Sequence, residues 1–70
     1  MKRSDLLRKI RKAAQQAEIA FELVRQGGAH EIYRCGSRQV TVPRHREINE
    51  YTAQGTMSDL DDVLGKGWWR

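Results

Sequence analysis

The chain has 70 residues, which allows one small domain with a limited core, spanning residues 1–70. Its 13 basic and 9 acidic residues give a net charge of +4, and the isoelectric point is about 9.7. A single cysteine excludes an internal disulfide, and no C-x-x-C pair indicates a zinc site. No stretch has the roughly 20 apolar residues that cross a bilayer, and the charged start lacks a signal-peptide core, so we expect a soluble cytoplasmic protein.

The charges are distributed unevenly along the chain. Basic residues crowd the first 12 positions and recur between residues 25 and 46, whereas acidic residues concentrate between residues 47 and 62. A basic N-terminal part and an acidic C-terminal part indicate a polyanionic partner, such as a nucleic acid, for the basic part. The alternative is an ordinary solvated surface with no such partner.

The first predicted element is an amphipathic helix over residues 4–18. Ser4 is a good N-cap residue for it, and its basic side chains, among them Lys9 and Lys12, lie mainly on the outer side. The apolar positions that recur at helical spacing are Leu6, Leu7, Ile10, Ala14 and Ala17.

Period-two alternation then predicts three strands. Gly27-Gly28 and Gly36-Ser37 supply short turns between them, and Pro43 ends the third. Turns this short predict an antiparallel meander. The strands are expected over residues 21–25, 30–35 and 38–42.

Alternation also predicts which side chains share a face of the sheet. In the first strand, Phe21, Leu23 and Arg25 fall on one face. In the second strand, His30 and Cys35 have opposite parity and therefore point to different faces.

A second helix is predicted after an irregular stretch over residues 44–55. Thr56 is expected to cap it, with Asp59 three residues later, and Gly65 ends it. Both helices then cover one face of the sheet, which gives a two-layer α+β domain of order α-β-β-β-α. Double-stranded RNA-binding domains have the same order of elements.

His30 is the first candidate for chemistry. Histidine is a natural general base near neutral pH because its unperturbed pKa is about 6.5. His30 directly follows Gly27-Gly28-Ala29, and a glycine turn lets a phosphate backbone approach closely. The alternative is a hairpin turn followed by a half-exposed strand histidine with no catalytic role.

The other reactive side chains give weaker signals. His45 lies between Arg44 and Arg46, and its simplest interpretation is a solvated loop histidine beside two phosphate-contacting arginines. Cys35 is expected to be an ordinary small side chain. Nothing in the spacing of His30, Cys35 and His45 predicts a metal site, so no metal is expected.

The sequence resembles the HicA family of toxin–antitoxin systems over most of its length. The family's central motif is glycine, then serine or threonine, then histidine, at the start of the second strand. Here it is Gly28-Ala29-His30, so Ala29 replaces the hydroxyl residue. The matching segments are Ser4-Asp5-Leu6-Leu7, Phe21 to His30, Val40 to His45, and Gly55-Thr56-Met57.

The resemblance implies a metal-independent endoribonuclease with a double-stranded RNA-binding-like fold and no cofactor. The role of the family's motif histidine passes to His30, which is expected to take a proton from a ribose 2′-OH. The implied partners are mRNA and a HicB-type antitoxin that neutralises the toxin. The protein is expected to be a monomer when free and a hetero-oligomer with its antitoxin.

The predicted substrate-binding residues surround His30 in the sequence or carry positive charge. A bound RNA backbone is expected to contact both the first helix and the segment after the third strand. The alternative function is a non-catalytic RNA-binding module, and Ala29 in the motif is its best support. The predicted set is Gly28, Arg25, Lys9, Lys12, Arg44 and His45.

Overall fold

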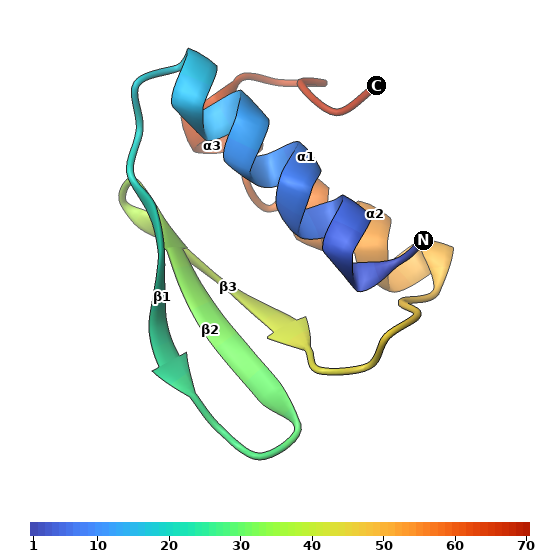
Figure 1. Cartoon of the computed structure of the whole chain (residues 1–70). Helices are drawn as coiled ribbons and strands as arrows, with labels where there is room; N and C mark the ends of the chain where they lie inside the picture. The colour runs from blue at the N-terminus through green and yellow to red at the C-terminus, as the bar shows by residue number, and fades with distance from the viewer.

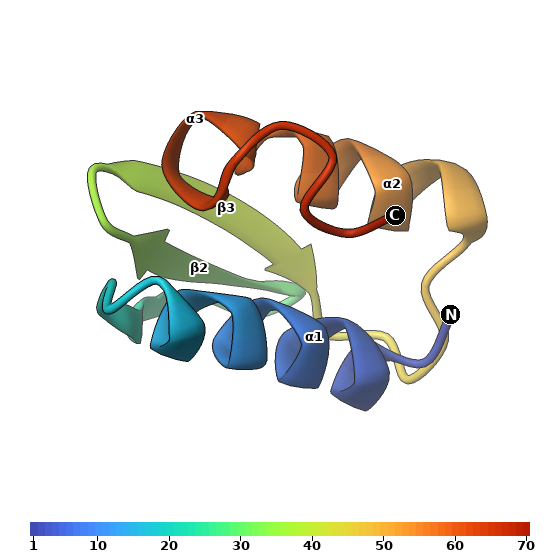
Figure 2. The same ribbon diagram turned by 90° about the horizontal axis from the view of Figure 1, so that it is seen from above.

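The computed structural model describes all 70 residues and shows two layers (Figure 1). The strands form one antiparallel sheet in the order β1-β2-β3. Figure 2 shows α1 and α2 side by side over the same face of that sheet. The predicted α+β architecture is therefore confirmed. The elements are α1 (Arg3–Gln16), β1 (Phe21–Gln26), β2 (His30–Cys35), β3 (Arg38–Pro43), α2 (Glu50–Ser58) and α3 (Asp61–Leu64).

The core lies between the sheet and the helices. Leu6 and Ile10 of α1, Val42 of β3 and Leu60 after α2 are completely buried there. Burial of such apolar side chains is the main favourable contribution to folding. None of the helices combines the length and the apolar character that a bilayer-spanning helix needs.

The second strand has the alternation that the sequence predicts. Tyr33 and Cys35 are buried beneath the helices, whereas His30 and Arg34 are exposed. The opposite orientation of His30 and Cys35 is thus confirmed. The sheet has one face covered by helices and one uncovered face, and His30 lies on the uncovered one.

A β-bulge in β1 changes the predicted faces of that strand. Leu23 pairs with Tyr33, but Arg25 pairs with Ile32, so Val24 is an extra residue without a partner in β2. Directly paired residues of antiparallel strands point to the same face. Leu23 therefore belongs to the helix-covered face and Arg25 to the uncovered one, and the prediction that Arg25 shares a face with Phe21 and Leu23 is wrong.

The second helix starts earlier than predicted. Asn49 is its N-cap, because its side-chain oxygen accepts a hydrogen bond from the Thr52 N–H at 2.7 Å. Thr56 is not a cap; it is buried inside α2, where its hydroxyl donates to the Thr52 carbonyl at 3.1 Å. The stretch over residues 44–55 is thus irregular only up to Asn49.

The first helix also differs at its start. Lys2 occupies the N-cap position, without a side-chain capping hydrogen bond, and Ser4 already lies inside α1. The backbone of Lys2 instead forms an antiparallel bridge with Glu47. This contact holds the start of α1 against the segment that follows β3.

The two cap positions give a direct test of these helix starts. Asn49→Ala should lower the free energy of unfolding by about 1 kcal/mol, because the Thr52 N–H loses its acceptor. Ser4→Ala should change it by less than about 0.5 kcal/mol, because the Ser4 side chain caps nothing. Urea unfolding of both variants provides the measurement, and an equal or larger loss for Ser4→Ala would contradict the observed helix starts.

Candidate functional site

The candidate site lies at the β1–β2 turn, which extends beyond the part of the sheet that the helices cover (Figure 1). The Gly27 N–H donates to the His30 carbonyl at 2.9 Å and closes this turn. The Arg44 N–H donates to the Ala29 carbonyl at 2.9 Å, and His30 pairs with Pro43 of β3. The backbone of His30 is therefore fixed on both sides while its side chain is exposed.

An open hollow of about 290 Å³ lies at this turn. A Cβ added to Gly28 would meet no atom within 4 Å, and Gly28 does not have a positive φ. The fold itself therefore does not require glycine at this position, and the space in front of it is open to a ligand. The hollow is lined by Arg25, Gly27, Gly28, Ala29, His30, Ile32 and Thr41.

Two arginines border His30 in different ways. Arg25 lines the same hollow because the bulge turns it to the uncovered face, and it has no ion-pair partner in the chain. Arg44 approaches from the other side of the turn, with its Nη1 atom 3.5 Å from the Gly27 oxygen and 3.4 Å from the Gly28 oxygen. The hollow is thus bordered by two cationic side chains.

A partly buried ion pair lies behind His30, on the helix-covered face. Glu31 is 8% exposed and forms an ion pair with Arg3 of α1. The Tyr33 hydroxyl donates to the same carboxylate at 2.8 Å, and Arg3 Nε donates to the Pro43 carbonyl at 3.0 Å. Arg3 therefore connects α1 to β2 and to the residue that pairs with His30.

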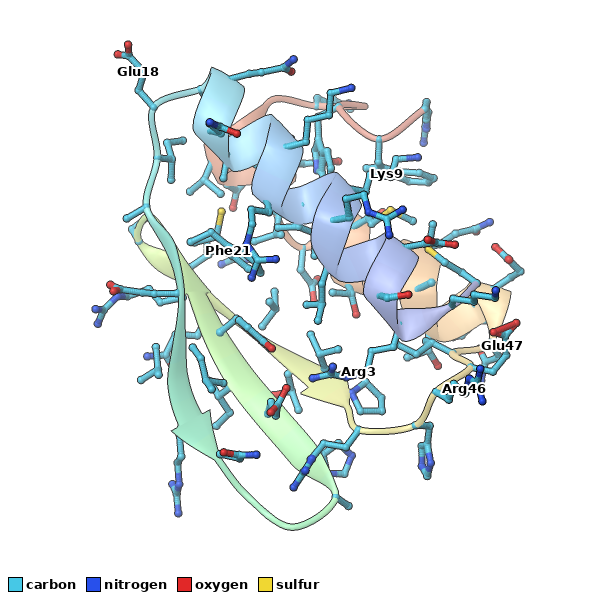
Figure 3. All side chains as sticks on the ribbon, in the orientation of Figure 1. Arg3, Lys9, Glu18, Phe21, Arg46 and Glu47 are labelled. Atoms are coloured by element: carbon cyan, nitrogen blue, oxygen red, sulfur yellow. The ribbon has the colours of Figure 1, made fainter.

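Sequence reasoning missed this ion pair. The sequence did contain one indication of it, because Glu31 is a carboxylate at an inward-facing position of β2. A buried charge requires a partner. The sequence alone did not indicate that Arg3, 28 positions earlier, is that partner. Figure 3 shows Arg3 at the start of α1, close to the end of β3.

The remaining predicted site residues lie outside the hollow. Lys9 and Lys12 are exposed on α1, in the layer on the opposite side of the sheet from His30, and Figure 3 shows Lys9 beside the middle of α1. His45 is exposed in the segment after β3 and does not line the hollow. The structure thus brings Arg25, Gly28, His30 and Arg44 together but not these three residues.

Cys35 lies apart from this site. It is completely buried on the helix-covered face, and this burial raises the pKa of its thiol above the ordinary value. A thiol with a raised pKa is a poor nucleophile. No group of three histidine, cysteine, aspartate or glutamate side chains is placed to hold a metal ion.

Together these features define a small α+β domain whose histidine is exposed beside a glycine turn and between two arginines. The family model described as the HicA toxin of bacterial toxin–antitoxin systems matches residues 7–61. The chain therefore belongs to the HicA toxin family, and it is a toxin of a toxin–antitoxin system with an antitoxin as its partner. Comparison with curated proteins and with solved structures found no match.

Proposed function

We propose that this toxin is an endoribonuclease that cleaves mRNA by transesterification, with His30 as the general base. The observation that carries the proposal is the shared hollow of His30 and Arg25 on the uncovered sheet face. A base and a cation beside one open space suit the attack of a hydroxyl group on a phosphodiester. The open space in front of Gly28 supports this, because it leaves room for a phosphate next to His30.

The reaction follows from these positions. A nitrogen of the His30 imidazole removes the proton from a ribose 2′-OH, and the 2′ oxygen attacks the adjacent phosphorus. The bond between phosphorus and the 5′ oxygen then breaks, which leaves a 2′,3′-cyclic phosphate on one product and a 5′-OH on the other. His30 keeps the removed proton, and water protonates the leaving 5′ oxygen, because His45 does not line the hollow.

The negative charge that develops on the phosphorane requires stabilisation. Arg25 lines the hollow, and Arg44 borders it at the carbonyls of the glycine turn. A preorganised cation at the position where charge develops lowers the barrier more than one that must move there. In this proposal Arg25 stabilises the charge on the phosphorane, and Arg44 contacts the neighbouring part of the RNA backbone.

Neutralisation by a HicB-type antitoxin is part of the proposal. A toxin with a net charge of +4 favours an acidic partner surface, and opposite charges speed the encounter. An antitoxin that covers the hollow would keep RNA away from His30. The free toxin would act as a monomer in the cytoplasm and form a hetero-oligomer with its antitoxin.

The direct test is incubation of the purified protein with RNA in EDTA. We expect new RNA fragments that carry 2′,3′-cyclic phosphate and 5′-OH ends, because His30 needs no metal for this step. The second candidate, an RNA-binding module without activity, is favoured by Ala29, a lining residue of the hollow that lacks the hydroxyl group of the family's motif. RNA that is retarded in a gel but stays intact would support that second function and contradict the first.

A further inference from the structure

A second hollow of about 440 Å³ lies at the start of α1, next to the segment that follows β3. No hydrophobic residue lines it. Its lining residues are Lys2, Arg3, Ser4, Arg44 and Arg46. The antiparallel bridge between Lys2 and Glu47 and the hydrogen bond from the Arg3 N–H to the Arg46 carbonyl, at 2.9 Å, hold the two segments together.

The cations of this hollow have few partners within the chain. Arg3 is paired with Glu31, but Lys2, Arg44 and Arg46 form no ion pair with a carboxylate. Glu47, the acidic neighbour of Arg46, lies 3.7 Å from the amino group of Met1. Figure 3 shows Arg3 and Arg46 at the same end of the molecule, with Lys9 farther along α1. Three of the four cations of this hollow, Lys2, Arg44 and Arg46, therefore have no counter-ion from the protein.

Arg44 connects this hollow to the one that contains His30. Arg44 is one of the residues that line the second hollow, while its Nη1 atom lies within 3.5 Å of the Gly27 and Gly28 oxygens at the first. Arg44 thus borders both hollows, and a chain that carries one negative charge per repeating unit is a ligand suited to place a charge in each of them. RNA is such a chain, because each nucleotide contributes one phosphate.

We propose that the hollow of Lys2, Ser4, Arg44 and Arg46 is a phosphate subsite for the RNA backbone, one that holds a phosphate next to the scissile one. The proposal rests on the proposed function for the identity of the ligand. Guanidinium groups bind phosphate through paired hydrogen bonds, and Lys2 adds a further charge. Such a contact positions the RNA backbone without reading its bases, so the subsite contributes to affinity and register but not to sequence preference.

The test measures binding of an RNA decamer with 2′-O-methyl groups on every ribose, which cannot undergo attack by its own 2′-OH. Affinity is measured by fluorescence anisotropy over a range of salt concentrations for wild type and for Lys2→Gln/Arg46→Gln. We expect weaker binding in the variant and a salt slope that is smaller by about 0.7, the contribution of one phosphate of a single strand. Neither side chain donates a hydrogen bond within the chain, so the variant should unfold at the same temperature as wild type.

Two further double variants make the result specific. Lys66→Gln/Arg70→Gln removes the same charge from two exposed positions near the C-terminus and should leave the salt slope unchanged. A slope that falls equally in this control would show a general charge effect and overturn the subsite. If the salt slope fell in Lys9→Gln/Lys12→Gln but not in Lys2→Gln/Arg46→Gln, the RNA would lie along α1. That result would also overturn the subsite.

The salt-slope measurement tests the subsite whether or not the protein cleaves RNA. If wild type leaves ordinary RNA intact but Lys2→Gln/Arg46→Gln still lowers the salt slope, the subsite holds and the proposed catalytic function fails. If wild type cleaves RNA and the slope is the same in the variant, the catalytic function holds and the subsite fails. An unchanged slope together with weaker antitoxin binding would assign the hollow to the antitoxin instead of RNA.

Discussion

Replacing His30 with alanine is expected to lower the rate of RNA cleavage by about 10²–10⁴-fold, the usual contribution of a general base. The side chain is exposed at the start of β2 and makes no hydrogen bond within the chain. Its removal should therefore change the unfolding temperature little. The rate is measured on a fluorogenic RNA in EDTA, next to thermal unfolding of the same preparation.

His45→Ala is the matched control for this prediction. It removes the other histidine of the chain, which is exposed but does not line the hollow of His30. Its cleavage rate should stay close to that of wild type. If His30→Ala cleaved RNA as fast as wild type, His30 would not be the base, and a rate loss confined to His45→Ala would move the chemistry to the segment after β3.

Replacing Glu31 with alanine is expected to lower the free energy of unfolding by about 3–5 kcal/mol, because it leaves a partly buried guanidinium without its counter-ion. The Arg3 side chain is 23% exposed and that of Glu31 is 10% exposed, so water compensates little for the lost contact. The Tyr33 hydroxyl also loses its acceptor. For a domain of this size the unfolding temperature should fall by roughly 10 °C or more.

The double variant Arg3→Met/Glu31→Leu shows whether the lost stability comes from an unpaired charge or from general disruption of the packing. Replacing both charges by apolar side chains of similar size should recover most of the stability, because no unpaired charge remains. Chemical unfolding followed by circular dichroism measures both variants. A loss below about 1 kcal/mol for Glu31→Ala would mean that this ion pair contributes no more than a surface pair.

Several features could be predicted from the sequence because they depend on local periodicity. Alternation in β2 fixed the opposite faces of His30 and Cys35, since neighbouring strand residues always point apart. The glycines at positions 27 and 28 marked the turn before His30, and the recurrence of Leu6 and Ile10 marked α1. The order of the elements then led to the two-layer fold, because each apolar face must be covered.

The start of α2 was missed for a local reason. The helix contains Gly55 and buries only Ala53, Thr56 and Met57 on its inner side, so it shows no clear apolar stripe. Asn49 supplies the cap, but Asn is equally common in turns. The packing of α2 over the sheet makes this segment helical despite its weak local preference.

The tertiary structure decided which members of the predicted set lie beside His30, and how they reach it. Arg25 reaches the uncovered face through a bulge that exists only in the pairing of β1 with β2, so alternation within one strand assigned it to the wrong face. Arg3 meets Glu31, and Lys2 lines the same hollow as Arg46, because the start of α1 packs against the end of β3 and the segment after it. Contacts between residues so distant in the chain depend on how the layers pack, and no local pattern encodes them.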